Sequence, residues 1–216
     1  MYIDIVADVA CPWCFIGKRR LERALALRPE IAATRSWRAF QLNPGLPPEG
    51  VPREVYLAAK SRGSRPEPRF GAIVAAGQAE GIDFAFERIR RMPNTLLAHR
   101  LIRLAAAEGG GDAMVEALFR AYFVDGVDIG DIAALARIAA QNGIDRRRAH
   151  AYLESQAGTA EVLAEDQRAR RLGIRAVPWL IIERGYVISG AQEPEMLLPL
   201  FDLATCGGNA AAAQPG

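Results

Sequence analysis

The sequence predicts an α/β fold in which a strand–helix–strand unit and a strand–strand–helix unit flank a long helical segment. Alternating apolar residues near both ends of the chain are typical of strands, whereas helical spacing dominates from the middle up to about residue 172. Of the 216 residues, 50% are hydrophobic and 24% are charged, which favours a folded core. The formal net charge of +2 does not favour nucleic acid as a partner, and no uninterrupted run of about 18 apolar residues predicts a membrane span.

The elements of the N-terminal unit are predicted from the spacing of its apolar residues. In MYIDIVADV the apolar Ile3 and Ile5 alternate with Tyr2 and Asp4, which predicts a strand. The next segment repeats apolar residues at helical intervals, and TRSWRAFQL alternates again. The predicted elements are, in order, a strand at 1–9, a helix at 12–27, a strand at 34–42 and a Pro/Gly loop at 43–52.

The C-terminal unit begins with two short β-rich runs, 179–182 and 186–189, joined by Glu183-Arg184-Gly185, which indicates a hairpin. A closing helix is expected over 194–204, kinked or shortened by Pro199. This order of elements matches a thioredoxin fold with a large all-helical insertion. The thioredoxin-like core is expected to be discontinuous, over 1–44 and 157–206, with a helical insertion domain at 45–156 and a flexible tail at 207–216.

Cys11-Pro12-Trp13-Cys14 directly follows the first predicted strand. A Cys-x-x-Cys in this place of a βαβ pattern is typical of a redox motif. Pro12 suits the first position of a helix, so Cys11 is the expected cap residue, with its sulfur facing the free amide groups of Trp13 and Cys14. These groups and the helix dipole favour the thiolate. We therefore expect Cys11 to attack disulfides and Cys14, one turn inside the helix, to resolve them.

Two other interpretations of the cysteine pair are weaker. A structural zinc site uses four ligands, whereas His99, His150 and Cys206 lie far from the pair in sequence, so no metal site is predicted. A pair of inert buried thiols would not require proline at the first helical position between them. Cys206 has no neighbouring cysteine in sequence and is expected to be a bystander thiol.

Two further features would complete a redox site. Val177-Pro178 stands at the start of a predicted strand, where proline is tolerated and an X-Pro bond can be cis. In a thioredoxin fold this loop forms the wall opposite the cysteines. Asp8 stands three residues before Cys11, close enough to take part in proton transfer with Cys14. The alternative for Asp8 is a loop residue that hydrogen-bonds to local backbone.

Five segments occur in the same order as in a known family, namely DVACPWCFIGKRRLE, FQLNPGLPPEG, NTLLAHRL, LFRAYFVDGVDIGD and GIRAVPWLIIERGYVISGAQ. Over about residues 3–200 the sequence resembles the DsbA family, specifically its FrnE-like cytoplasmic branch. The resemblance implies a thioredoxin fold with a helical insertion, a redox-active Cys11–Cys14 pair with no bound cofactor, and a cis peptide bond at Pro178.

The same layout belongs to the kappa-class glutathione transferases and the 2-hydroxychromene-2-carboxylate isomerases, which typically have Ser where this chain has Cys11. They bind glutathione through the backbone before the cis proline and at the start of the last helix. This resemblance implies substrate or glutathione contacts at Val177, Ala191 and Gln192. For Gln192 the alternative is a helix-start side chain without such a contact.

Three more residues lie in family-like motifs and are candidates to face the cleft, namely Asn43, Asn94 and His99. Of these, Asn43 is a candidate substrate or glutathione contact. His99 is expected to be a helix-surface or satisfied core histidine rather than a proton shuttle.

The sequence thus predicts a cytosolic thiol–disulfide oxidoreductase, since no signal-peptide pattern precedes the first strand. The expected partners are protein or small-molecule thiol and disulfide substrates, with glutathione as a candidate co-substrate. The alternative enzyme class is a glutathione-dependent isomerase or transferase, and a binding module with inert cysteines is a third reading. The sequence does not indicate an oligomeric state.

Overall fold

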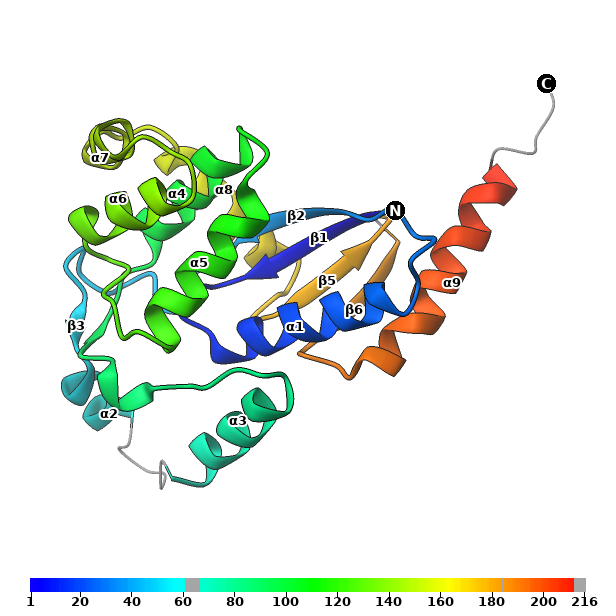
Figure 1. The fold of residues 1–216 in the computed structure, drawn as a ribbon, viewed down its shortest axis with the longest axis horizontal. Coiled ribbons are helices and arrows are strands. Elements are labelled where there is room, and N and C mark those ends of the chain that lie inside the picture. The colour runs from blue at the N-terminus through cyan, green and yellow to red at the C-terminus, as the bar shows by residue number, and fades with distance from the viewer. Residues whose placement is uncertain (61–66, 184, 212–216) are drawn as a thin grey trace.

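The computed structural model describes residues 1–60, 67–183 and 185–211, and a four-stranded sheet lies at its centre (Figure 1). The strand order is β2-β1-β5-β6. Strand β1 (Tyr2–Ala7) pairs in parallel with β2 (Thr34–Ala39) and antiparallel with β5 (Trp179–Ile182), which also pairs antiparallel with β6 (Tyr186–Ser189). Both strands of the hairpin have the predicted bounds, while Arg184 of its turn lies outside the described residues.

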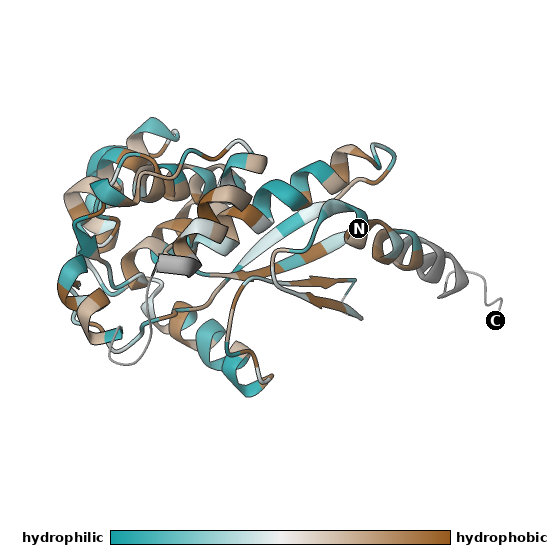
Figure 2. Ribbon diagram, turned by 90° about the horizontal axis from the view of Figure 1, so that it is seen from below, coloured by the Kyte–Doolittle hydropathy of each residue, from teal (hydrophilic) through white to brown (hydrophobic). Residues whose placement is uncertain are grey.

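Helices cover both faces of this sheet. Helix α1 (Pro12–Ala26) connects β1 to β2 and packs against α9 (Pro194–Ala211) on one face, while α8 (Thr159–Arg171) leads towards β5 on the other. Figure 2 shows the sheet nearly edge-on, with apolar residues along the strands between the two helical layers. Ile3 and Ile5 of β1 are 1% and 2% exposed, so the predicted alternation marks the buried face of this strand.

The segment between β2 and α8 is helical, as predicted, with one exception. Its helices are α2 (Arg53–Lys60), α3 (Glu67–Ala79), the short 3₁₀ helix η1 (Phe86–Arg88), α4 (Leu96–Ala106), α5 (Gly111–Phe123), α6 (Ile132–Gln141) and α7 (Arg146–Glu154). The exception is an antiparallel ribbon of β3 (Val51–Pro52) with β4 (Arg91–Met92). Strands of two residues are too short to display alternation, so the expectation of an all-helical insertion misses this ribbon.

Strand β2 ends at Ala39, before the predicted end at 42, because its partner β1 ends at Ala7, the residue paired with Ala39. Side chains of α8 bind the outer edge of β2 at this end. The Glu165 carboxylate accepts a hydrogen bond from the Ala39 N–H at 2.9 Å, and the Asp166 carboxylate accepts one from the Gln41 N–H at 2.8 Å. These contacts join residues more than a hundred positions apart, so the alternation in the sequence gives no sign of them.

Helix α9 differs from its predicted extent in two ways. Pro199 lies inside the helix without ending it, and the helix continues to Ala211, beyond the expected end at 204 and into the segment expected to form a tail. Alanine, which is frequent there, has the highest intrinsic helix propensity. Residues 212–216 of the expected tail lie outside the described residues. None of the described helices is both long and apolar enough to cross a membrane.

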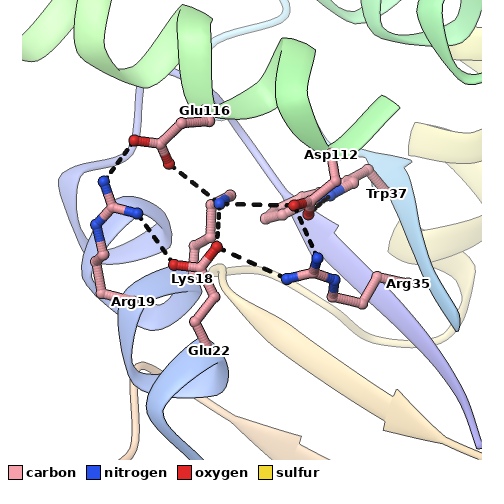
Figure 3. A network of polar contacts seen from close by, with 7 residues as sticks. All are labelled: Lys18, Arg19, Glu22, Arg35, Trp37, Asp112 and Glu116. Carbon is pink, nitrogen blue, oxygen red and sulfur yellow. Dashed lines mark hydrogen bonds and ion pairs between the residues drawn. The ribbon is translucent and has the colours of Figure 1, made fainter. Parts of the chain in front are cut away.

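Helix α1 is fixed to α5 and β2 by a network of polar contacts (Figure 3). The Lys18 side chain is 3% exposed, and its Nζ lies 3.1 Å from Glu116 and 3.7 Å from Asp112 of α5 and also pairs with Glu22 of its own helix. The other members of the network are Arg19, Arg35 and Trp37. The network holds the helix that carries the two cysteines against the helical segment.

Candidate active site

The cysteines of the predicted motif lie at the N-terminal end of α1. Cys11 is the N-cap residue, with φ −100° and ψ 114°, and Pro12 occupies the first turn. The backbone N–H of Cys14 donates to the Cys11 carbonyl at 3.0 Å. Because proline lacks an N–H and already has a helical φ, the Cys-Pro pair itself determines where the helix begins.

The Cys11 sulfur is expected to face the N–H groups of the helix end, but the structure does not show this contact. The Cys11 side chain makes no capping hydrogen bond. Its Sγ instead donates to the Val177 carbonyl oxygen at 3.6 Å. A thiol carries its own hydrogen, so a carbonyl acceptor is a better partner than an amide donor. The prediction that Cys11 is the cap residue is therefore confirmed, whereas the expected contact of its sulfur with the amide groups of the helix end is not formed.

Cys14 lies behind Cys11 and is more deeply buried. Its exposed fraction is 1%, compared with 5% for Cys11, and Trp13 between them is 36% exposed. Burial raises the pKa of the Cys14 thiol well above its ordinary value, and a hydrogen bond with Cys11 and the charge of Cys11 raise it further. A backbone hydrogen bond at Asp8 acts in the opposite direction. Cys14 is therefore a thiol at neutral pH and needs a proton acceptor before it can attack.

The wall opposite the cysteines is the Val177-Pro178 loop, whose peptide bond is cis. The Pro178 carbonyl accepts a hydrogen bond from the Gly190 N–H at 2.8 Å. A Cβ atom built on Gly17 of α1 would lie 3.0 Å from Pro178 Cγ, so the missing side chain allows this close approach. A cavity of about 10 Å³ remains at this contact, lined among others by Cys14, Gly17, Pro178, Gly190, Ala191 and Gln192.

Asp8 lies at the turn between β1 and α1 and is 1% exposed. One carboxylate oxygen accepts the Ala10 N–H at 3.1 Å and the other accepts the Leu42 N–H at 2.7 Å. His99 of α4 places its Nε2 atom 3.6 Å from Asp8 Oδ1 and 3.2 Å from the Phe40 carbonyl oxygen. His99 is therefore a buried histidine with hydrogen-bonding partners, and Asp8 does bind the local backbone.

Residues 2–201 match the family of DsbA-like thioredoxin domains. This chain belongs to that family. A probable DsbA oxidoreductase from Streptomyces coelicolor matches with a TM-score of 0.85 and 30% identity, over 100% of this chain and 92% of that chain.

Two solved structures of lower identity share the fold of this DsbA-like chain. A 2-hydroxychromene-2-carboxylate isomerase has a TM-score of 0.73 at 18% identity, over 99% of this chain and 100% of that chain. The cytosolic disulfide reductase DsbM from Pseudomonas aeruginosa, solved with GSH, has a TM-score of 0.63 at 18% identity, over 99% of this chain and 100% of that chain. The predicted DsbA family and the thioredoxin fold with a helical insertion are confirmed, and the FrnE-like branch stays a prediction.

Two of the residues predicted to contact substrate or glutathione lie beside the cysteines in this DsbA-like chain. Ala191 and Gln192 line the same cavity as Cys14 and Pro178. The Gln192 amide donates to the Ser189 carbonyl at 2.8 Å, so it also stabilises the loop that carries it.

The two candidate asparagines make contacts within the segment that follows β2. Asn43 accepts a hydrogen bond from the Tyr56 hydroxyl at 2.9 Å. Asn94 donates to the Leu46 carbonyl at 2.8 Å and accepts the Leu96 N–H at 3.0 Å. Both side chains thus join loop segments to each other or to α2 and α4.

Sequence reasoning misses two residues that shape this site. Gly17 could have been noticed, because a glycine inside a helical pattern often marks a close approach. Arg20 has no such signal. Its guanidinium donates to the Ala191 carbonyl at 2.5 Å and pairs with Glu80 at 3.1 Å and Glu193 at 2.5 Å. Arg20 therefore fixes the loop before α9 to α1.

The described residues contain no group of three or more His, Cys, Asp or Glu side chains arranged to hold a metal ion. Cys206 lies in α9, and its side chain is outside the described residues. The two cysteines that the described residues place in the site are Cys11 and Cys14.

Proposed function

We propose that this chain is a cytosolic thiol–disulfide oxidoreductase in which Cys11 attacks and Cys14 resolves. The observation that carries the proposal is the difference between the two thiols. Cys11 is the cap residue at the N-terminal end of α1, the end of a helix that favours negative charge. Cys14 is buried behind it with a raised pKa, and so it stays protonated until the second step.

The reaction proceeds by two successive exchanges. The Cys11 thiolate attacks a sulfur of the substrate disulfide, forms a mixed disulfide and releases the other substrate sulfur as a thiolate. Cys14 then gives its proton to the Asp8 carboxylate and attacks Cys11 Sγ, which releases the second substrate thiolate. The substrate disulfide is reduced by two electrons, and the cysteine pair is oxidised to a disulfide. The same steps run in reverse when the oxidised pair meets a dithiol.

The proposed substrates are protein or small-molecule thiols and disulfides, with glutathione as a candidate co-substrate. The family membership supports thiol and disulfide substrates. The role of glutathione as a co-substrate is supported by the fold shared with DsbM, which was solved with GSH and is described as cytosolic. Val177, Ala191 and Gln192 are the proposed contacts, because they lie at the wall and cavity beside the cysteines.

The test is to trap the mixed disulfide in a Cys206→Ser background, which removes the third thiol. Cys14→Ser should accumulate disulfide-linked adducts with cytosolic proteins on non-reducing gels, because only an external thiol can then release them. Cys11→Ser should form none, since Cys14 is 1% exposed. Equal adduct formation by both variants, or none by either while the unsubstituted pair cycles normally, would contradict the assignment.

A glutathione-dependent isomerase or transferase is the second candidate, because the fold is shared with a 2-hydroxychromene-2-carboxylate isomerase. The two candidates are separated by counting free thiols during turnover. Consumption of an aromatic substrate that requires glutathione but leaves the thiols of Cys11 and Cys14 unchanged would favour the isomerase or transferase. Reversible loss and recovery of two thiols per chain would favour the oxidoreductase.

A further inference from the structure

Three exposed arginines lie where α8 ends and the chain turns towards the Val177-Pro178 wall. Arg168 and Arg171 belong to the last turn of α8, and Arg175 follows in the loop that leads to β5 (Figure 1). Within the described part of the chain, none of these three side chains takes part in an ion pair. We name these three residues the basic rim.

The carboxylates of α8 do not neutralise the basic rim. Asp166 pairs with Arg170 at 2.7 Å, and Glu165 pairs with Arg103 of α4 at 3.0 Å. Glu161 stands seven residues before the first arginine of the rim, which is about 10 Å along the helix axis. The carboxylates nearest to the rim are therefore bound to other cations, and the positive charge of the rim faces solvent.

The basic rim lies at the active-site end of the sheet. Arg175 stands two residues before Val177, so their Cα atoms are at most about 8 Å apart. The Val177 carbonyl in turn accepts the Cys11 thiol at 3.6 Å. Arg170 of the last turn of α8 donates to the Gln41 carbonyl at 2.6 Å, in the segment that leaves β2 beside the end of β1. Both parts of the rim are thus close to the attacking sulfur.

The helix dipole does not explain the whole rim. Cations in the last turn of a helix are favoured by its dipole, which accounts for Arg168 and Arg171. The effect falls off beyond that turn, so it does not account for Arg175, which follows the helix. What the three residues share is their place beside the active-site wall.

We propose that the basic rim binds acidic residues of a peptide segment that flanks the disulfide attacked by Cys11. This inference rests on the proposed function and names a substrate class for it. An exposed guanidinium offers a planar fork of N–H donors that fits a carboxylate. Cations grouped at one edge of a site also speed the encounter with a substrate of opposite charge.

A peptide segment fits this surface better than a small anion does. The cavity beside Cys14 and Pro178 is only about 10 Å³, whereas the rim extends from the loop before the wall along the last turn of α8. A chain that places its disulfide at Cys11 and continues towards α8 meets the arginines with its next residues. The preferred substrates are therefore proteins or peptides with acidic residues beside the disulfide.

The experiment compares substrates that differ in the charge of their flanks. Reduced protein in the Cys206→Ser background is mixed with peptides that contain one intramolecular disulfide flanked by glutamates, glutamines or lysines. Acid quenching and chromatography give the second-order rate constant of reduction. Glutathione disulfide is the fourth substrate, an anion without a flanking segment. Each rate is measured at about 0.01 M and about 1 M salt, where the Debye length is about 30 Å and 3 Å.

Two triple variants carry the comparison to the protein. The rim variant combines Arg168→Gln, Arg171→Gln and Arg175→Gln. The matched control removes the same charge from exposed arginines of α6 and α7, with Arg137→Gln, Arg146→Gln and Arg147→Gln.

At low salt, wild type should reduce the glutamate peptide about tenfold faster than the glutamine peptide, because steering raises association rates by about 10–10³. The lysine peptide should be the slowest. The advantage of the glutamate peptide should disappear at high salt and in the rim variant, and the control should keep it. The glutamine peptide should react equally fast with all three proteins, since their thiol chemistry is the same.

Equal rates for the glutamate and glutamine peptides in wild type, or an advantage that the rim variant keeps, would overturn the inference. So would a loss of the same size with glutathione disulfide, because the arginines would then serve small anions. If wild type reduces none of the four substrates, the proposed function itself fails and the inference falls with it. Should the rim variant not fold, Arg175→Gln alone should lower the glutamate rate about twofold, since independent contributions add. An unchanged rate in that variant contradicts the inference.

Discussion

The two halves of α1 are held by different kinds of interaction. The first turn, from Cys11 to Cys14, has no charged side chain and contacts the Val177-Pro178 loop through the Cys11 sulfur and the Val177 carbonyl. Gly17, between the two halves, approaches Pro178 closely. The following turns carry Lys18, which pairs with carboxylates of α5, and Glu22, which pairs with Arg35 of β2 (Figure 3). Arg20 and Arg23 pair with the buried Glu80.

The difference separates the position of the helix from the reactivity of its end. A cation beside a cysteine lowers its pKa and an anion raises it, so ion pairs in the first turn would set the thiol chemistry as well as hold the helix. Because the ion pairs begin one turn later, the helix is fixed without placing a salt bridge on the sulfurs. Substitutions in the two halves should therefore change different measured quantities.

The largest effect is expected for Cys11→Ala. Disulfide exchange should be lost completely, because the attacking sulfur is removed and Cys14 is too buried to replace it. The free energy of unfolding of the reduced protein should change by less than about 1 kcal/mol, since one small side chain is lost. Insulin reduction measures the first quantity and urea unfolding measures the second. An active Cys11→Ala protein would place the reactive thiol elsewhere.

Lys18→Met should lower the free energy of unfolding and leave the reactivity of Cys11 unchanged. Its Nζ is buried among three carboxylates, and removing one partner of a buried charge cluster costs about 3 kcal/mol of stability. The alkylation rate of Cys11 should not change. Arg148→Met is the matched control, because Arg148 pairs with Glu108 at an exposed position and should contribute about 0.5 kcal/mol or less. Equal destabilisation by both variants would mean that the network of Figure 3 adds no special stability.

Gly17→Ala lies between the two halves and should affect both properties. The added Cβ would meet Pro178 Cγ at 3.0 Å and Ala191 Cβ at 3.5 Å, and overpacking of this kind costs about 1–3 kcal/mol. Exchange should slow, because the Pro178 wall must move away from α1. Gly71→Ala in α3 meets nothing within 4 Å and should instead stabilise the protein by up to about 1 kcal/mol. Thermal melting of the Gly17→Ala and Gly71→Ala variants measures the two changes in stability.

The smallest effect is a pH dependence of stability in the reduced protein. The pKa of Cys14 is raised in the folded state above its ordinary value of 9.0, so between the two values the folded state binds more protons than the unfolded state. The stability that Cys14 contributes is therefore complete below about pH 9 and is lost as the pH rises above it. Urea unfolding at pH 7 and pH 10 should show a smaller loss for Cys14→Ser than for wild type.

The sequence predicts those parts of the fold and site that depend on neighbouring residues. Pro12 alone determines the start of α1 and makes Cys11 its cap, and alternation locates both strands of the C-terminal hairpin. The fold class follows from the order of these elements, and the family match confirms it. The roles of Cys11, Cys14 and the wall residues stay predictions that the experiments above test.

Contacts between distant segments are what the sequence does not reveal. The Cys11 sulfur faces Val177, 166 positions away, rather than the N–H groups of its own helix, and the Asp8–His99 pair joins a turn to α4. Arg20 reaches Ala191 in the same way. Each depends on how two elements pack, and neither the type nor the spacing of nearby residues indicates the partner.

The carboxylates of α8 on the edge of β2 also limit how this sheet can associate with other chains. An open edge strand offers unpaired N–H and carbonyl groups on which a peptide or a second molecule can add a strand. At β2 the outward N–H groups of Ala39 and Gln41 are already bound by Glu165 and Asp166. A strand added there would have to displace two charged side chains, so the end of β2 nearest the active site is protected against β-sheet extension and the aggregation that follows from it.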